Sequence, residues 1–368
     1  MQFTCSTSKL IEALQIATKA LANRTTNQIL EGVLIETDME ELTLTCSDER
    51  ITIITRIPAD ISEPGRGVVP GKLFSEIVRR LPDDTVDIRM DNRFVFTIRS
   101  ASSRTNISGQ DADLFPRLPK MDDEREISLP QDMLRDMIQK TEFAIAQDDM
   151  REVLTGCLLE IGQQELRVVA LDGFRLALRK EPIVGPQEPV SAVVGGKILG
   201  DISKTLGEGE EPVSIRVSRS HIQLEIGKTR IVARLLEGEF IRYRQILPDE
   251  WQTRITVGRA ELGSAIDRAS LIAREGKNNL VCFKIDGGEL LVTSNSESGD
   301  VEERIAIETE GKDLTIAFNV RYITDVLKAL SDDEVFMRFN SNVSPCVICP
   351  TTGDAYLYLV LPVRVFGA

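Results

Sequence analysis

The strongest constraint on the fold is a pattern that occurs three times in the sequence. The copies are residues 69–90 (VPGKLFSEIVRRLPDDTVDIRM), 194–217 (VGGKILGDISKTLGEGEEPVSIRV) and 318–339 (FNVRYITDVLKALSDDEVFMRF). Each copy has a basic residue at the start of a short helix, then an acidic turn, then an alternating strand. The basic residues Lys72, Lys197 and Arg321 are 125 and 124 positions apart. A repeat of this length is a whole domain, so the sequence predicts three similar domains in a row.

Other segments recur with the same step. Gly32 and Gly156 each open a hairpin-like segment and are 124 positions apart, and a looser third copy begins at Val281. Phe115 and Phe240, 125 apart, stand near the ends of the first two copies. The predicted domains are 1–122, 127–250 and 253–368, with polar linkers near 120–128 and 248–255. Three copies in one chain suggest a curved or ring-like body.

Each domain is predicted to be an α+β layer pair with two helices and several antiparallel strands. Apolar residues recur three and four apart in 8–21, 131–146 and 259–275, which indicates amphipathic helices. The repeated pattern adds shorter helices near 71–80, 197–204 and 321–328. Runs such as Leu42, Leu44 and Cys46, apolar at every second residue, are typical of strands with one buried face.

Composition favours a chain with real hydrophobic cores. The 368 residues are 42% hydrophobic, which suits three domains of about 120 residues. The opening MQFTCSTSKL lacks the apolar region of a signal peptide, and no run approaches the roughly 20 apolar residues that span a bilayer. We therefore expect a soluble, cytoplasmic protein without a membrane partner.

The sequence contains no catalytic constellation, so we predict no enzyme, no cofactor and no metal. Its one histidine, His221, lies in a strand-like run, and no His-Cys cluster offers zinc ligands. Gly71-Lys72 and Gly196-Lys197 resemble part of a phosphate-binding loop but lack its first glycine and its magnesium-binding hydroxyl. Cys346 and Cys349 stand in a strand-like run, which favours packing over metal or redox chemistry.

The distribution of charge separates helices from sheets. The net charge is −14, which alone argues against nucleic acid. The predicted helical windows, extended to residues 8–24, 71–80, 132–142, 197–204, 259–277 and 321–328, nevertheless hold 16 basic and 10 acidic residues. They carry +6 and the rest of the chain −20. Such helices would attract a polyanion on one face only; ordinary solvated helix faces are the alternative interpretation.

Four motifs carry a family resemblance. They are LDGFRLAL (171–178), EGEFIRYRQILP (237–248), FNVRYITDVLKAL (318–330) and YLVLPVRVFGA (358–368). In this order and spacing, and with the three-copy layout, they resemble the bacterial DNA sliding clamps, the beta subunits of DNA polymerase III. The resemblance covers the whole chain.

The resemblance implies a processivity factor of DNA replication. Two chains of three clamp domains would join head to tail as a homodimer and close a six-domain ring, with antiparallel sheets outside and two helices per domain inside. Each chain would be half of that ring, which encircles duplex DNA, slides along it and tethers the replicative polymerase. The alternative is a three-domain protein-interaction scaffold that does not encircle DNA.

The resemblance also implies a hydrophobic pocket between domains two and three. It would bind a short linear motif of the DNA polymerase III alpha subunit, the clamp loader, other polymerases and repair proteins. The matched residues are Leu154, Leu171, Gly173, Phe174, Arg175, Leu176, Ile241, Ile246, Asn319, Tyr322, Val343, Val360, Leu361, Pro362, Val363 and Arg364. Apolar walls would bury leucine and phenylalanine anchors, while Arg175 and Arg364 would bond peptide oxygens.

Three features depart from the family's pattern near this pocket. Phe174 stands where many members have histidine, and Ile241-Arg242 replaces a common Pro-Asp. The chain continues past the family's usual end as Phe366-Gly367-Ala368.

Basic residues of the helices and adjoining loops are expected to face the duplex through phosphates alone, without sequence preference. These DNA-facing candidates are Arg24, Lys72, Arg79, Arg80, Lys140, Lys197, Lys204, Arg268, Arg274 and Arg321. The aromatic pair that well-known members carry after the counterpart of Arg151 is Glu152-Val153 here.

Overall fold

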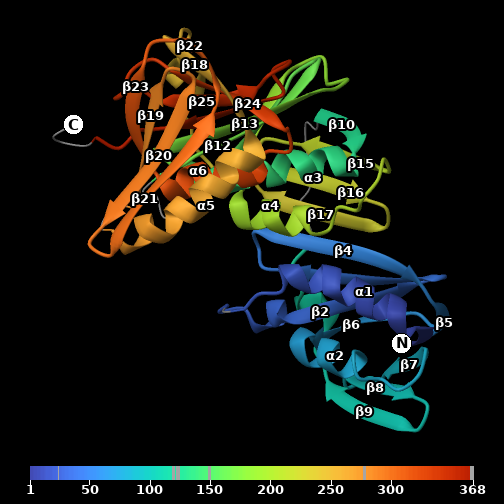
Figure 1. Cartoon of the computed structure of the whole chain (residues 1–368). Helices are drawn as coiled ribbons and strands as arrows, with labels where there is room; N and C mark the ends of the chain where they lie inside the picture. Colours follow the sequence, from blue (N-terminus) through green and yellow to red (C-terminus); the bar gives the residue numbers. More distant parts are fainter. Residues whose placement is uncertain (24, 118–120, 122–124, 148–150, 277–278, 365–368) are drawn as a thin grey trace. The chain divides into compact units, whose positions relative to one another are not determined.

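The computed structural model describes residues 1–23, 25–117, 121, 125–147, 151–276 and 279–364 (Figure 1). The chain forms two compact units. Unit 1 contains Met1–Asp132 and Asp201–Leu235, and unit 2 contains Met133–Gly200 and Leu236–Ala368. The second predicted domain therefore divides its strands between the two units.

Unit 1 has two antiparallel sheets. Their strand orders are β5-β1-β7-β8-β9 and β10-β15-β16-β17-β4-β3-β2-β6. The strands are β1 (Gln2–Ser6), β2 (Gly32–Asp38), β3 (Glu41–Ser47), β4 (Ile51–Pro58), β5 (Asp60–Glu63), β6 (Gly65–Pro70), β7 (Thr85–Met90), β8 (Val95–Ser100), β9 (Ser103–Ser108), β10 (Arg125–Pro130), β15 (Pro212–Val217), β16 (His221–Ile226) and β17 (Thr229–Arg234). The helices α1 (Thr7–Ala17) and α2 (Gly71–Val78) pack side by side.

Unit 2 also has two antiparallel sheets. Their orders are β14-β11-β12-β13-β26-β25-β24-β18-β22 and β21-β20-β19-β23. The strands are β11 (Gly156–Ile161), β12 (Glu165–Leu171), β13 (Arg175–Pro182), β14 (Val190–Gly195), β18 (Thr253–Gly258), β19 (Leu280–Asp286), β20 (Glu289–Ser296), β21 (Gly299–Ala306), β22 (Glu308–Gly311), β23 (Leu314–Asn319), β24 (Glu334–Phe339), β25 (Cys346–Pro350) and β26 (Tyr356–Val360).

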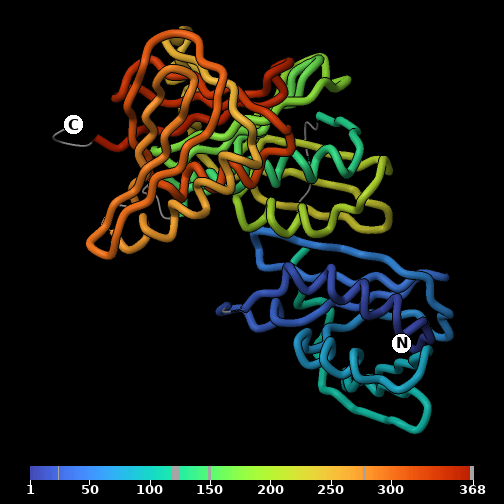
Figure 2. The backbone as a smooth tube through the Cα atoms, in the orientation of Figure 1, coloured from blue at the N-terminus to red at the C-terminus, as the bar shows by residue number. Residues whose placement is uncertain are grey.

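Four helices lie wholly or mostly in unit 2. They are α3 (Gln131–Gln139), α4 (Gly196–Ser203), α5 (Arg259–Glu275) and α6 (Val320–Ala329). Helix α5 lies along β20 and β21 and packs beside α6 (Figures 1 and 2). Across the described residues no helix is long and apolar enough to cross a membrane.

Strand pairing crosses both junctions between the predicted domains. β4 pairs with β17, and β13 pairs with β26, each antiparallel. At the end of each of these two strand pairs, a main-chain hydrogen bond occupies the equivalent position. Arg234 N donates to Arg50 O at 2.8 Å at the first junction, and Leu361 N donates to Phe174 O at 2.8 Å at the second. Because Arg50 and Phe174 are 124 positions apart, the structure confirms that the sequence repeat is a repeat of folded domains.

The six predicted helices are confirmed, but two end early. The 8–21 and 131–146 predictions correspond to α1, ending at Ala17, and α3, ending at Gln139, each followed by a short 3-10 turn. Thr18 Oγ1 donates to Leu14 O at 2.6 Å, and Thr141 Oγ1 donates to Met137 O at 2.8 Å. Hydroxyl groups that bond carbonyls of the preceding turn compete with the helical ladder, which explains the early ends.

The linker predictions were partly wrong. Residues 125–128 of the predicted first linker lie in β10, and residues 253–255 of the second lie in β18. Ile127, Leu129 and Ile255 are buried at alternate positions. Their polar neighbours face outward, which gave these short strands the composition of a loop.

Gly156, which is 124 positions after Gly32, allows the backbones of β11 and β14 to lie close together, and a substitution there tests this packing. An added Cβ would lie 2.3 Å from Val194 O, whereas a Cβ at Gly200 in α4 would meet nothing within 4 Å. We predict that Gly156→Ala lowers the free energy of unfolding by about 2 kcal/mol or more, and that the matched Gly200→Ala raises it by about 0.5–1 kcal/mol. Urea unfolding followed by circular dichroism measures both. Equal stability of the two variants would contradict this packing.

Candidate functional site

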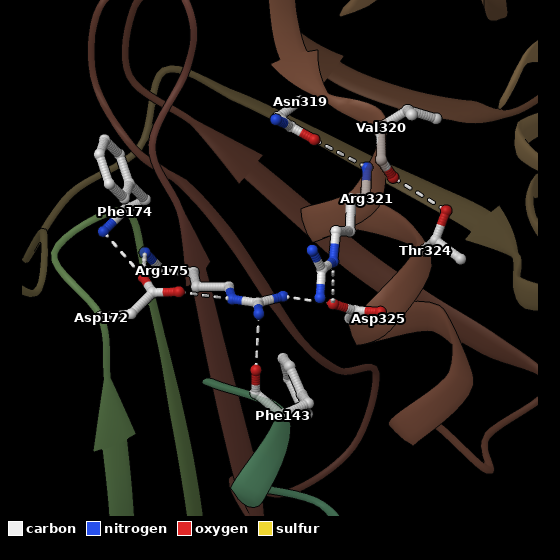
Figure 3. Close-up of polar contacts among 9 residues, drawn as sticks. All are labelled: Phe143, Asp172, Phe174, Arg175, Asn319, Val320, Arg321, Thr324 and Asp325. Carbon is white, nitrogen blue, oxygen red and sulfur yellow. Dashed lines mark hydrogen bonds and ion pairs between the residues drawn. The ribbon is translucent and has the colours of Figure 1, made fainter. Parts of the chain in front are cut away.

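The site begins at the turn between β12 and β13. Gly173 has a φ of +88°, a left-handed conformation that side chains rarely adopt. Asp172 Oδ1 accepts hydrogen bonds from Phe174 N at 2.9 Å and from Arg175 N at 3.0 Å. This Asp-Gly turn fixes Phe174 and Arg175 at the edge where β13 meets β26 (Figure 3).

The guanidinium of Arg175 joins three segments of unit 2. Its Nε donates to Asp172 Oδ2 at 2.9 Å, Nη1 to Asp325 Oδ2 at 2.6 Å and Nη2 to Phe143 O at 2.6 Å (Figure 3). Arg175 is only 7% exposed. A buried charge of this kind is tolerated because its donors are matched by carboxylates and a carbonyl.

Aromatic rings enclose the same guanidinium. Its Cζ lies 4.8 Å from the centre of the Tyr322 ring and 5.4 Å from that of Phe143. Tyr322 in turn stacks on Phe174, with ring centres 6.0 Å apart and planes at 22°. Burial, together with the nearby Asp172 carboxylate, raises the pKa of Tyr322. Phe174 remains 57% exposed, so the stack ends in an open aromatic face.

The start of α6 supports this arrangement. Asn319 caps the helix, since its Oδ1 accepts from Arg321 N at 3.0 Å, and Thr324 Oγ1 donates to Val320 O at 2.8 Å (Figure 3). The Arg321 side chain is 75% exposed, with Nε 3.9 Å from Asp325 Oδ2. Asn319 thus orders the helix that carries Tyr322 and Asp325.

The predicted pocket residues separate into a buried floor and an exposed rim. Leu154, Leu171 and Leu176 belong to one hydrophobic core cluster, and Ile241 packs partly against it. Val360 is buried, and Pro362 and Val363 are half-buried. The rim consists of Phe174, Ile246 (46% exposed), Val343 (56%) and Leu361 (36%), with Arg364 also exposed.

The segment that carries Ile241 and Ile246 is held by one carboxylate. Glu160 accepts from Tyr243 OH at 2.6 Å and from Arg244 Nη1 and Nη2 at 2.9 and 2.6 Å. Burial alone would raise the pKa of Glu160, but the bonds from Arg244 and Tyr243 outweigh it and lower that pKa. Burial and the same bond raise the pKa of Tyr243 to about 12.

The candidate DNA-facing residues differ in their exposure and in their ion pairs. Lys72, Lys197, Lys204, Arg274 and Arg321 are exposed on or beside helices. Ion pairs within the same unit join Arg79 and Arg80 to Glu76, Arg268 to Glu303, Lys140 to Asp136 and Arg321 to Asp325. Arg24, like the tail Phe366-Gly367-Ala368, lies outside the described residues.

The positioning residues Phe143, Asp325 and Glu160 were missed by the sequence analysis. Asp325 lies 150 positions from Arg175, and Phe143 contributes a main-chain carbonyl, which carries no residue signature. One signal existed: Asp325 stands four residues after Arg321 in a predicted helix, on the same face as that arginine.

Comparison with known proteins covers the entire chain. Residues 1–119, 128–241 and 244–364 match the N-terminal, central and C-terminal domains of the DNA polymerase III beta subunit. The Beta sliding clamps of Bacillus subtilis and Staphylococcus aureus are 35% and 34% identical to this chain, with complete coverage of both sequences in each pair.

Solved structures give the same result. The sliding clamp from Bacillus subtilis superposes with a TM-score of 0.97 at 35% identity, covering all of both chains. The DNA polymerase III beta subunit from Thermotoga maritima gives 0.91 at 31% identity, covering 99% of each. The clamp from Pseudomonas aeruginosa bound to griselimycin gives 0.94 at 28% identity, covering 99% of this chain and 100% of that one.

Three clamp domains and a complete match define a DNA clamp, a processivity factor for DNA polymerase that acts in DNA replication. The chain belongs to the DNA polymerase III beta subunit family. The fold-class prediction, three repeated α+β clamp domains, is confirmed.

The Arg175 network can be tested through its farther carboxylate. Asp325→Asn leaves the buried guanidinium with a weaker acceptor, so we predict a loss of about 1–3 kcal/mol in the free energy of unfolding. Arg321→Gln, which changes an exposed side chain on the same helix, should cost less than about 0.5 kcal/mol. Urea unfolding compares the two. Equal losses in the free energy of unfolding for the two variants would show that the bond from Arg175 to Asp325 does not stabilise the fold more than an exposed side chain does.

The Glu160 cluster predicts a pH dependence. The pKa of Glu160 is lower in the folded protein than in the unfolded chain, where it is about 4.3. The carboxylate therefore contributes its full stabilisation above about pH 4.3, and this contribution is lost as the pH falls through the pKa of the folded state. Tyr243→Phe removes one bond to the carboxylate and should cost about 1 kcal/mol at pH 7. The difference from the wild type should shrink below about pH 4.3. A difference that stays constant from pH 7 to pH 3 would contradict the assignment.

Proposed function

We propose that two copies of this chain join head to tail into a ring that encircles duplex DNA and tethers polymerase by topology. The observation that carries this proposal is the match of three clamp domains over the whole chain. The proposed role is binding, not catalysis, and it belongs in the cytoplasm, where the chromosome is replicated. The proposed domain boundaries remain 1–122, 127–250 and 253–368.

Two strand edges support head-to-tail closure. β9 is the last strand of a unit 1 sheet, and β21 is the last strand of a unit 2 sheet. Unpaired edges are templates for another chain. On the β9 side, Arg99 and Arg104 are exposed and directly opposite each other. β21 carries the acids Asp300, Glu302 and Glu303 and one arginine, Arg304. Like charges opposite each other are unfavourable, so an acidic partner strand would relieve them.

In each unit a helix carries an exposed leucine. Leu271 is exposed on α5, which packs on β21, and Leu73 is exposed on α2 of unit 1. Burial of such side chains between two copies would add hydrophobic stabilisation to the strand pairing. A scaffold that never closes would leave both edges and both leucines in water.

The exposed cations on the helices are proposed to attract phosphates without reading bases. Lys72, Lys197, Lys204, Arg274 and Arg321 are candidates because their side chains are exposed. Arg268 is also exposed, but its two hydrogen bonds to Glu303 reduce the net positive charge that it contributes. Weak, non-specific attraction suits sliding, since base-specific bonds would hold the ring in place.

The rim of Phe174, Ile246, Val343 and Leu361 is proposed to bind a short linear motif of partner proteins. The partners implied are the DNA polymerase III alpha subunit, the clamp loader, and other polymerases and repair proteins. Exposed apolar side chains above a rigid core suit the anchors of a peptide. The relative from Pseudomonas aeruginosa has been solved with griselimycin bound, which supports a ligand site on a clamp of this fold.

Arg175 is proposed to position this site rather than to contact the peptide. Each of its three guanidinium nitrogens already bonds an acceptor of the chain, and the side chain is almost fully buried. Arg364, which is exposed, remains the candidate for bonding peptide oxygens.

Ring closure is tested on DNA of different topology. The wild-type protein, loaded by a clamp loader, should stay on nicked circular DNA and leave once that DNA is linearised, as measured by gel filtration. Leu271→Asp should be a monomer by light scattering and should not be retained, whereas Val184→Asp, at another exposed position, should behave as wild type. Equal loss from circular and linear DNA by the wild type would refute encirclement and favour the scaffold alternative.

The peptide site is tested with rim variants that spare the core. Ile246→Ala with Leu361→Ala should weaken binding of a leucine- and phenylalanine-containing clamp-motif peptide at least tenfold, because each removes exposed apolar contact area. Leu114→Ala, at an exposed leucine of unit 1, is the matched control. Fluorescence polarisation gives the affinities. Unchanged binding by the double variant would place the peptide elsewhere.

A further inference from the structure

The outer end of the nine-stranded sheet in unit 2 carries a stack of arginines and aromatic rings. Arg254 Cζ lies 5.1 Å from the ring centre of Trp251 and 4.4 Å from that of Phe336. Arg338 Cζ lies 5.8 Å from the same Phe336 ring. Rings that flank a guanidinium hold its planar fork in place, which prepares it for a planar anion.

The two arginines of this stack differ in whether they are paired with an acid. Arg254 and Arg338 are directly opposite on β18 and β24, so their side chains lie on the same face. Glu310 forms an ion pair with Arg254. Arg338 forms no ion pair with any described residue, and its Nε is buried without a hydrogen-bond partner. An arginine stays charged at any ordinary pH, so one guanidinium is left without a counter-ion.

The strand register connects this stack to the proposed peptide site. Leu176 is opposite Leu359, Leu359 opposite Val347, and Val347 opposite Arg338. Directly paired residues share a face, so the row runs from the floor of the site to Arg338. Three strand spacings amount to about 14 Å, the length of roughly four extended residues.

The β24–β25 hairpin gives a second connection. Arg338 is the next-to-last residue of β24, and the loop that follows carries Val343, which belongs to the exposed rim. A peptide anchored at the rim therefore passes close to the hairpin on which Arg338 lies.

We propose that Arg338 and Arg254, framed by Trp251 and Phe336, form a subsite for an acidic side chain of the bound partner peptide. The acidic residue would lie about four positions from the peptide's apolar anchors. A carboxylate fits because its two oxygens match the fork of a guanidinium. This subsite rests on the proposed peptide site and would raise the affinity for partners with an acidic flank.

Two matched peptides test the subsite. Both carry the same leucine and phenylalanine anchors. They differ at two positions, one located four residues before the anchors and one located four residues after them. The first peptide has glutamate at both positions, and the second has glutamine at both. We expect the glutamate peptide to bind the wild-type ring about fivefold more tightly by fluorescence polarisation, with the gap closing in 1 M salt. Trp251 is the chain's only tryptophan, so its fluorescence should respond to the glutamate peptide and not to the glutamine peptide.

Arg338→Gln isolates the contribution of the unpaired guanidinium. It should abolish the difference between the two peptides and leave the affinity for the glutamine peptide unchanged. Lys284→Gln, a charge removal on β19 in the other sheet of unit 2, should preserve the difference. Equal affinity of the two peptides for the wild type, or a difference that survives in Arg338→Gln, would overturn the subsite while leaving the peptide site intact. Failure of both peptides to bind would overturn both.

Discussion

The site depends on one backbone feature, the antiparallel pairing of β13 with β26. This pairing places Arg175 opposite Val360 and brings the turn after β12 beside the segment that begins at Leu361. The buried guanidinium can then reach Asp325 and the carbonyl of Phe143. Because a buried charge without partners costs several kcal/mol, a shift of these strands that broke the Arg175 bonds would be unfavourable. Main-chain hydrogen bonds and one ion cluster together give the rim a rigid base.

The junction between consecutive domains occurs twice, at β4–β17 and at β13–β26. The residues that differ between these two junctions explain why the apolar rim occurs only at the second. At the first junction, Ser47, Arg50 and Thr52 stand where the second has Leu171, Phe174 and Leu176, each 124 positions later. Ser47 and Thr52 bond each other through their hydroxyl groups at 2.8 Å and are buried. The repeated domain thus gives both junctions the same backbone. At the first junction polar side chains bond each other, whereas at the second apolar and aromatic side chains replace them and form the floor and the edge of the site.

Much of the fold followed from the sequence, because the repeat spacing places corresponding elements without any knowledge of contacts. The six helices and the hairpins after Gly32 and Gly156 were predictable in this way. The early end of α3 was not, because it depends on where the Thr141 hydroxyl bonds. The division of the pocket into buried Leu176 and exposed Val343 also required the structure. Alternating apolar residues identify a buried face but not which side chains remain in water at its edge.

Domains two and three share one continuous sheet, and amide hydrogen exchange of the free protein measures that continuity. The hydrogen-bonded amides of β13 and β26 should exchange as slowly as those between β11 and β12 inside domain two, since all belong to one ladder. Exchange of the β13–β26 amides at the rate of an edge strand such as β22 would be the opposite result. It would show that the two domains meet only loosely.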